Sequence, residues 1–256
     1  MDRQLFTATL QQKLVLSEPG ECYHLQFSVE EVSEFDFVPG QFISCIAEDA
    51  RGKQQTRAYS IASAPQGNII DICLNRVEGG FFSNLLCDLE PGQTMQFHGP
   101  HGLFTLRQPL TDTILIAVDT GIAPIRGFIE WLFPENGQDR GQGRHISLVH
   151  GAHASSEIYY RKYFEKIAAE HHNFQYLPIV SHPHDGWDGL RGYVPEHLAK
   201  IVADRKPAAQ NAATIAPDGF DIHAYICGLN EMISPCREKL KELGWQRKQI
   251  VFERYD

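Results

Sequence analysis

Three features that mark other protein classes are missing from this chain of 256 residues. It has no run of 18 apolar residues, and its first residues form no signal-peptide core, so we expect a soluble cytoplasmic protein without a membrane partner. Its six cysteines include no Cys-x-x-Cys pair, which argues against an iron–sulfur cluster or a zinc site. It has no excess of positive charge, since the formal net charge is -9, and this argues against a nucleic-acid partner.

What is present begins with residues 57–63, Arg-Ala-Tyr-Ser-Ile-Ala-Ser, on a predicted strand. Successive strand side chains point to opposite faces, so Arg57 and Tyr59 share one face and Ser60 lies on the other. A guanidinium binds a phosphate bidentately, an aromatic ring stacks on a planar heterocycle, and a hydroxyl group hydrogen-bonds a ring nitrogen. The segment is therefore a candidate flavin site. Taken alone, it also fits an ordinary sheet segment with a surface arginine.

A second segment, residues 75–86, ends a predicted strand, passes through Gly79 and Gly80, and begins a short helix. Two glycines let the backbone approach a ligand closely, and N–H groups at a helix start suit a pyrophosphate. The same residues also fit a tight turn followed by a hydrophobic staple.

Together the two segments resemble the ferredoxin–NADP reductase family, whose flavin domain carries Arg-x-Tyr-Ser and then Gly-Gly-x-x-Ser. Pro-Gly turns at 39–40 and 91–92 and the Gly-Pro-His-Gly-Leu-Phe segment at 99–104 sit where that family's barrel joins its strands. The resemblance implies bound FAD rather than FMN, with Tyr59 on one ring face and Ser60 at flavin N5. The implied FAD residues are Arg57, Tyr59, Ser60, Ile61, Asn75, Arg76, Gly79, Gly80, Phe81, Phe82 and Ser83.

The second half opens with an apolar run that stops at a Thr-Gly turn at 120–121 and continues as an amphipathic pattern. A buried parallel strand that passes into a helix has this pattern. It resembles the same family's nicotinamide-nucleotide motif, usually Gly-Thr-Gly-Ile-Ala-Pro, with Thr120, Gly121, Ala123 and Pro124 as the matching residues. Asp119 replaces the first glycine, and its carboxylate would repel a pyrophosphate unless it points away or caps the helix.

Further strands at 145–152, 175–181 and 224–228 alternate with helices, including one at 157–167. This alternation predicts a doubly wound parallel sheet whose ligands lie beyond the carboxyl ends of its strands. A low-complexity stretch at 204–219 reads as a loop before the last of these strands.

With the barrel that the resemblance implies, we expect an all-β plus α/β protein. Residues 1–108 would form a six-stranded antiparallel Greek-key β-barrel that binds FAD. Residues 109–256 would form the doubly wound NAD(P)-binding domain.

Four residues are implied by the resemblance to act on the nicotinamide and the flavin. Cys227 lies near nicotinamide C4, with Gly228 beside it, and Ser60 contacts flavin N5. The ending Glu-x-Tyr places Glu253 in a proton or hydrogen-bond path and Tyr255 over the second flavin face. Tyr255 also fits a frayed terminal aromatic residue.

Coenzyme choice depends on residues that fill the family's 2'-phosphate site. NADPH-specific relatives use a Ser-Arg pair and then a basic residue and a tyrosine. Ser181, His182, Arg191 and Tyr193 stand in those places, so one arginine has become a histidine that is mostly uncharged at neutral pH. No acidic residue occupies these positions, which favours NADP(H) over NAD(H), and His153 and Arg161 could add to the site. His182 equally fits an exposed turn.

The resemblance implies an oxidoreductase that moves hydride between nicotinamide C4 and flavin N5 and exchanges electrons with ferredoxin or flavodoxin. Arg76, Arg107 and Arg126 are candidates for docking an acidic carrier. Two alternatives remain open: an NADH-dependent reductase component of an oxygenase or haem-protein system, and an electron-transfer subunit that turns over only within a larger complex.

Overall fold

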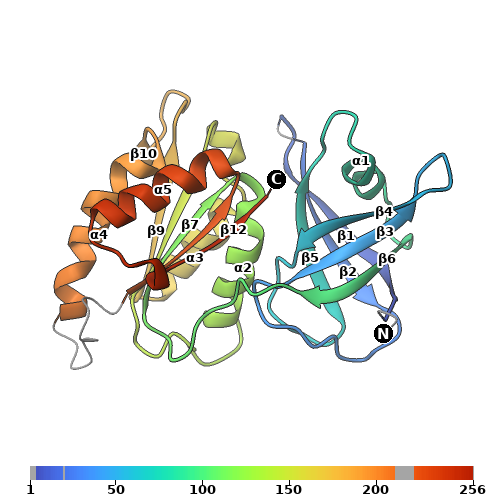
Figure 1. Ribbon diagram of the computed structural model, residues 1–256, viewed down its shortest axis with the longest axis horizontal. Coiled ribbons are helices and arrows are strands. Elements are labelled where there is room, and N and C mark those ends of the chain that lie inside the picture. Colours follow the sequence, from blue (N-terminus) through green and yellow to red (C-terminus); the bar gives the residue numbers. More distant parts are fainter. Residues whose placement is uncertain (1–3, 20, 211–221, 256) are drawn as a thin grey trace. The chain divides into compact units, whose positions relative to one another are not determined.

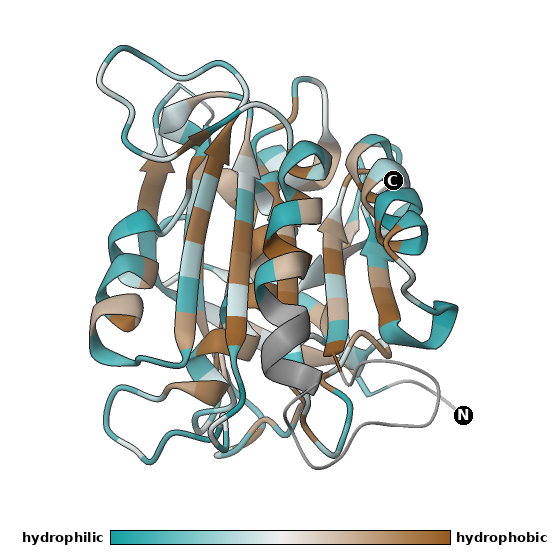
Figure 2. Cartoon of the chain, turned by 90° about the vertical axis from the view of Figure 1, so that its left-hand side faces the viewer, coloured by the Kyte–Doolittle hydropathy of each residue, from teal (hydrophilic) through white to brown (hydrophobic). Residues whose placement is uncertain are grey.

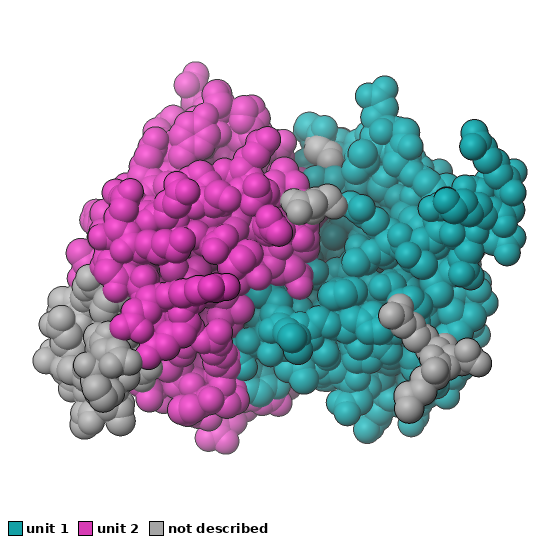
Figure 3. Space-filling model, in the orientation of Figure 1, with its two compact units in different colours: residues 1–106, 123–135 teal, residues 107–122, 136–256 magenta. Residues whose placement is uncertain are grey.

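The computed structural model describes residues 4–19, 21–210 and 222–255. The chain divides into two compact units, Met1–Leu106 with Ala123–Glu135, and Arg107–Ile122 with Asn136–Asp256 (Figure 3). The division is not a single cut, because a helical segment of the second half groups with the first unit. A domain boundary near residue 108 stays a prediction.

The first unit is built on one antiparallel sheet of six strands in the order β4-β3-β6-β1-β2-β5 (Figure 1). An isolated bridge between Ile61 and Ile72 joins the end of β4 to β5, the two edge strands of that order. The predicted antiparallel domain is thus confirmed. Its elements are β1 (Phe6–Ser17), β2 (Cys22–Val29), β3 (Phe42–Glu48), β4 (Gln54–Ser60), β5 (Ile69–Asn75), α1 (Phe81–Cys87) and β6 (Thr94–His101).

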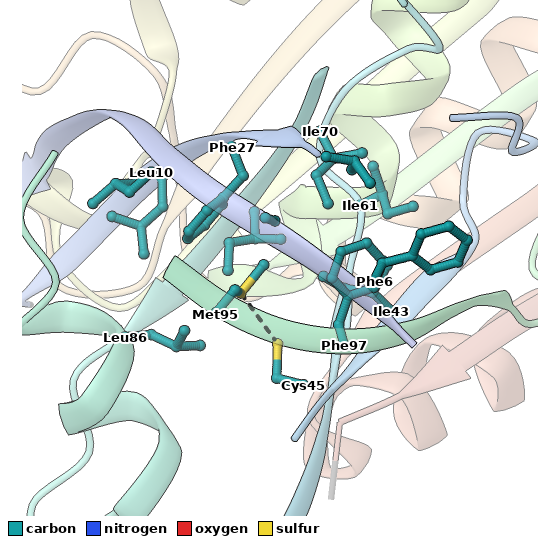
Figure 4. Close-up of a cluster of buried hydrophobic side chains, with 14 of the residues drawn as sticks. Phe6, Leu10, Phe27, Ile43, Cys45, Ile61, Ile70, Leu86, Met95 and Phe97 are labelled. Atoms are coloured by element: carbon teal, nitrogen blue, oxygen red, sulfur yellow. Dashed lines mark hydrogen bonds between the residues drawn. The ribbon is translucent and has the colours of Figure 1, made fainter. Parts of the chain in front are cut away.

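Apolar side chains alternate along these strands and form the core on one face of the sheet, because successive strand residues point to opposite faces. Ile43 and Cys45 of β3 are buried there together with Phe97 of β6 (Figure 4). The Cys45 thiol donates to the Met95 sulfur at 3.6 Å. All six cysteines of the chain are buried, and no disulfide joins them.

The second unit carries a sheet of six parallel strands in the order β10-β9-β8-β7-β11-β12. Hydrophobic residues gather along its strands and hydrophilic ones on the outer helix faces (Figure 2). The strands are β7 (Asp112–Val118), β8 (Ile146–Ala152), β9 (Phe174–Val180), β10 (Leu190–Arg191), β11 (Ile222–Gly228) and β12 (Ile250–Arg254). The helices that follow them are η1 (Asp119–Gly121), α2 (Ile122–Leu132), η2 (Ser155–Glu157), α3 (Arg161–Glu170), α4 (Val194–Gln210), α5 (Asn230–Glu242) and η3 (Arg247–Gln249).

Helices cover both faces of the parallel sheet, so the doubly wound prediction is confirmed. Val149 of β8 belongs to one core cluster with Leu198 of α4 and Leu240 of α5. Its neighbour His150 points the other way, and its ring centroid lies 6.1 Å from that of Phe164 of α3.

Two predicted boundaries differ from the structure. The helix expected from residue 157 begins at Arg161, because Tyr160 has a left-handed backbone with φ 58° that a continuous helix cannot contain. The loop expected at 204–219 is wrong for 204–210, which continue α4. Alanine has a high helix propensity, and the low-complexity interpretation of this stretch overlooked that propensity. Residues 211–219 lie outside the described part of the chain.

Among the residues that the structure describes, no helix combines the length and the apolar character needed to cross a bilayer. In the same part of the chain, no group of three or more histidine, cysteine or acidic side chains is arranged to hold a metal ion.

Candidate functional site

The flavin segment predicted from sequence lies at the end of β4, where β3 fixes its register. Tyr59 pairs with Ile43 and Ser60 with Phe42. Arg57 is exposed, Tyr59 is half-buried against the core cluster of this unit, and Ser60 is buried. Burial raises the pKa of the Tyr59 hydroxyl, so this side chain is neutral at physiological pH.

The Gly79-Gly80 turn before α1 is held by side chains of the helix that it precedes. The Val77 N–H donates to the Ser83 hydroxyl at 3.1 Å, and the Asn84 amide donates to the Val77 carbonyl at 3.0 Å. Gly79 has φ 69°, and no atom lies within 4 Å of where its Cβ would be. The backbone at Gly79 is therefore both fixed and open to close approach by a ligand.

The other predicted FAD residues lie around this turn and around the strand ends. Asn75 ends β5, Phe81 is 39% exposed, and Phe82 packs in the core. Ile61 is fully buried, so it supports the flavin segment from behind rather than presenting a side chain.

Arg76 is less available than its sequence position suggested. Its guanidinium donates to Asn84 at 2.8 Å and to Asp88 at 2.7 Å, and Glu21 lies 3.5 Å away. The hydrogen bond to Asp88 raises the arginine's pKa. These contacts hold Arg76 against α1 and weaken its candidacy for docking an acidic partner.

Arg126 of α2 has a different role from the expected surface cation. It donates to the Ala62 carbonyl at 2.5 Å and pairs with Asp71 at 3.1 Å, and its side chain is 13% exposed. Glu130, one turn on, accepts the Ala64 N–H at 2.9 Å. Arg126 is thus committed to fixing residues 62–64, the backbone that follows the flavin segment.

Asp71 at the centre of this network is itself buried, 4% exposed. It lies 3.6 Å from His24 Nε2, and burial lowers the pKa of His24 to about 4. The histidine is therefore neutral at physiological pH, and Arg126 supplies the compensating charge. Nothing in the sequence pattern marked this network, since its members come from three distant segments.

In the second unit, the predicted nucleotide turn follows β7. Asp119 has φ 54° and begins η1, while Gly121 lies against the end of β11. A Cβ at Gly121 would lie 2.3 Å from the Cys227 carbonyl oxygen and 2.7 Å from the Gly228 nitrogen. The glycine is required because two backbones meet there.

The left-handed backbone explains both the usual glycine and the aspartate at position 119. Glycine adopts positive φ freely, and aspartate is among the few other residues that tolerate it. Burial raises the pKa of Asp119, Glu157 raises it further, and His153 opposes them. Thr120 is half-buried beside it, and Ala123 and Pro124 are buried in the first turn of α2.

Cys227, Glu253 and Tyr255 come together at the carboxyl ends of β11 and β12. Cys227 pairs in register with Glu253, and the Tyr255 N–H donates to the Gly228 carbonyl at 3.0 Å. Cys227 is fully buried, and burial raises the pKa of its thiol well above the ordinary value. Glu253 raises it further, and a side-chain hydrogen bond with Tyr255 opposes the rise.

The residues predicted for the 2'-phosphate also lie together. Arg191 pairs with Val180, so β10 brings it next to Ser181. The Ser181 hydroxyl lies 3.1 Å from His182 Nδ1, and the His182 and His153 ring centroids lie 4.3 Å apart with the rings tilted by 40°. Tyr193 is 59% exposed.

Two further side chains change this picture. The Tyr193 N–H donates to the Glu196 carboxylate at 3.0 Å, so an acidic group lies beside the turn although none stands at the motif positions. Arg161 is paired with Glu165 at 2.7 Å and Asp188 at 2.6 Å. Of the two residues that could add to the 2'-phosphate site, His153 lies beside His182, whereas Arg161 is held in ion pairs with Glu165 and Asp188.

Known protein families match the two halves of the chain. Residues 7–106 match the oxidoreductase FAD-binding domain, and residues 115–238 match the oxidoreductase NAD-binding domain. Ferredoxin–NADP reductase B of Sorangium cellulosum is 35% identical over 236 residues, which cover 91% of this chain and 91% of that protein. The glycine betaine monooxygenase reductase subunit of Pseudomonas aeruginosa is 28% identical, over 94% of this chain and 62% of that longer protein.

Among solved structures, a ferredoxin NADP+ reductase from Neisseria gonorrhoeae with bound FAD and NADP has a TM-score of 0.77 at 20% identity. The match covers 99% of each chain. At 20% identity this similarity establishes the fold alone. The family is established by the sequence similarity to relatives such as ferredoxin–NADP reductase B.

Proposed function

This chain belongs to the ferredoxin–NADP reductase family and is a flavin-dependent NAD(P)H oxidoreductase, and we propose that it passes electrons between NADP(H) and a ferredoxin or flavodoxin. The observation that carries the proposal is the meeting of Gly121 with Cys227. It joins a nucleotide-binding turn to a buried thiol and, through β12, to the Glu253 and Tyr255 pair.

On the flavin side, the described residues fit FAD. Arg57 is an exposed cation that suits a phosphate, Tyr59 offers a half-buried ring, and Gly79 leaves its backbone open. Bound FAD would supply the exchange between two-electron and one-electron chemistry. The chain's part is to hold it: Arg126 and Glu130 fix the backbone at 62–64, and Ser83 fixes the turn at Gly79.

On the nicotinamide side, the proposed role of Cys227 is contact rather than nucleophilic attack. Its raised pKa keeps the sulfur protonated at neutral pH. A neutral thiol adds no charge beside a carbon that gives or receives hydride. Glu253 and Tyr255 would order the groups around it, and Tyr255 would leave its place when nicotinamide binds.

NADP(H) is the proposed coenzyme because a hydroxyl group, two imidazoles and a guanidinium gather around Ser181. Ser181, His182 and Arg191 are assigned to the 2'-phosphate, with His153 behind His182. Tyr193 would stack on the adenine. Glu196 works against this choice, since a carboxylate near the phosphate costs binding energy unless Arg191 screens it.

The first test is stopped-flow reduction of the purified, FAD-loaded protein by NADPH and NADH in parallel, followed in the flavin absorption band. Much faster reduction by NADPH supports the proposal. The carrier is tested by adding ferredoxin or flavodoxin and measuring its reduction. A protein that retains no flavin and shows no diaphorase activity contradicts the whole assignment.

The second candidate is an NADH-dependent reductase component. The similarity to the glycine betaine monooxygenase reductase subunit favours it, and so does Glu196. Faster reduction by NADH than by NADPH would decide for it. A third arrangement, a subunit active only within a complex, requires reduction by either coenzyme to be slow in the isolated chain.

A further inference from the structure

A basic pocket of 470 Å³ lies in the second unit, away from the proposed nucleotide turn. Five of its seven lining residues are cationic and none is acidic, in a chain whose net charge is -9. The residues that define this basic pocket are Arg107, Arg237, Lys241, Arg247, Lys248, Ile250 and Phe252.

Three separate segments bring these cations together. Arg237 and Lys241 are one turn apart on α5, Arg247 and Lys248 form most of η3, and Arg107 precedes β7. Like charges at this spacing repel one another. A fold that gathers them from three segments without a lining carboxylate offers a site where a bound anion relieves that repulsion.

Two of the guanidinium groups are already held in place. Arg107 donates from its side chain to the Lys248 carbonyl, and its N–H donates to the Tyr225 hydroxyl at 2.8 Å. The Arg237 guanidinium lies 3.8 Å from the centroid of the Phe252 ring. Because these contacts restrict the side chains beforehand, a ligand loses less binding energy in ordering them.

The position in the sheet separates the basic pocket from the nucleotide turn. Ile250 pairs with Ala224, and Ala224 pairs with Ile114. Phe252 pairs with Ile226, and Ile226 pairs with Ile116. The turn follows Val118, which lies four residues, about 13 Å, beyond the level of Ile250 and two residues, about 7 Å, beyond the level of Phe252. Side chains along β12 also alternate between the two faces of the sheet. Ile250 and Phe252 line the pocket, whereas Glu253 points to the opposite face, beside Cys227.

We propose that this basic pocket binds a small molecule bearing two or more phosphate groups. Three guanidinium groups suit the paired oxygens of phosphates, which they bind bidentately. The volume lies within the range of about 300 to 1,000 Å³ that small-ligand sites occupy. Ile250 and Phe252 add an apolar wall. This site is additional to the electron-transfer function and does not depend on it.

Inorganic pyrophosphate is the probe, titrated calorimetrically into the FAD-loaded protein. Saturating oxidised NADP+ is present, so that the nucleotide turn is already occupied. Arg237→Gln and Lys241→Gln should each weaken pyrophosphate binding about tenfold, since each removes a charge-assisted contact. Arg237→Lys should lose nearly as much affinity for pyrophosphate. Lysine keeps the charge, but it cannot bind a phosphate bidentately or lie flat on the Phe252 ring as the guanidinium does.

The matched control is Lys239→Gln on the same helix. Lys239 pairs with Glu242 at 3.1 Å and does not line the pocket. The Lys239→Gln substitution removes the same charge as Lys241→Gln, and it should leave both pyrophosphate binding and flavin reduction unchanged.

Three outcomes would overturn the proposal. Wild-type protein could give no binding heat at low salt. The control could lose as much affinity as Arg237→Gln, which would mean a diffuse charge effect. Or a polyglutamate peptide could bind where pyrophosphate does not, which would make the pocket a docking surface for an acidic protein. Circular dichroism of each variant separates these outcomes from misfolding.

Discussion

Gly121 and Cys227 meet backbone to backbone, with 2.3 Å between the carbonyl oxygen of Cys227 and the place where a Cβ at Gly121 would be. The Cys227 carbonyl cannot move aside without displacing the end of β11, because Cys227 is paired with β12 on one side and with β7 on the other.

Gly121→Ala should therefore displace the nucleotide turn. We expect a loss of about 2 kcal/mol or more in unfolding free energy, from a backbone clash in a buried site. Reduction by NAD(P)H should fall strongly while FAD is retained. Urea unfolding and stopped-flow reduction check this. The control Gly143→Ala lies at φ 72° in open space, so it should cost only about 1 kcal/mol from backbone strain.

Cys227→Ser should slow hydride transfer more than it weakens coenzyme binding. The change keeps the size roughly but replaces a buried thiol with a more polar hydroxyl group. Single-turnover reduction at increasing NADPH gives the rate and the binding constant separately. Cys236→Ser, at another buried thiol of the same unit, should leave the reduction rate nearly unchanged. Equal rates in the wild type and in Cys227→Ser would remove Cys227 from the site.

Asp119→Asn should make the protein more stable at neutral pH. Since the folded-state pKa is raised above the ordinary 3.8, folding favours the protonated carboxyl group. That stabilisation is complete below 3.8 and is lost as the pH rises through the raised value. Asparagine cannot ionise beside Glu157, so the gain in stability relative to wild type grows as the pH rises from 3.8 through the raised pKa and is complete above it. Thermal unfolding over a pH series measures the difference, and a constant difference at every pH would contradict it.

Asp119→Gly should also tighten coenzyme binding. It removes both the carboxylate and the cost of a left-handed aspartate, which the family's usual glycine avoids. A lower dissociation constant for oxidised NADP+, measured by calorimetry, is the expected result. Weaker binding would mean that the carboxylate helps to position the coenzyme.

Arg126→Gln should destabilise the first unit and release FAD. Removing one partner from a buried pair leaves Asp71 uncompensated, which costs about 3 kcal/mol. Arg161→Gln, at a more exposed ion pair, should cost far less. Urea unfolding and flavin fluorescence after gel filtration are the two readouts. Full FAD retention in Arg126→Gln would show that residues 62–64 hold their place without it.

Arg191→Gln and Glu196→Gln should move coenzyme preference in opposite directions. The first removes the cation assigned to the 2'-phosphate and should raise the KM for NADPH about tenfold with little effect on NADH. The second removes the opposing charge while keeping an acceptor for the Tyr193 N–H, so it should lower the KM for NADPH. Equal effects on both coenzymes would place the phosphate elsewhere.

Local patterns in the sequence were enough to predict the strands, and they place the proposed site residues at strand ends and turns. The alternation at Arg57 and Tyr59, and the apolar run before Gly121, both report on one element at a time. The Arg126–Asp71 pair and the basic pocket could not be read in this way, because their members are brought together only by the sheet order. Glu196 was missed for a related reason, since its carboxylate reaches back three residues to the turn it supports.

Strand β12 consists of five residues, and it has a different task on each face. Ile250 and Phe252 face α5 and the cations, while Glu253 stands beside Cys227. Since side chains alternate strictly, a slip of one residue would exchange the two sets and abolish both. An insertion or deletion in this short strand therefore cannot be neutral, whereas substitutions at alternate positions should affect one face and spare the other. Mutational tolerance along β12 should thus follow a period of two.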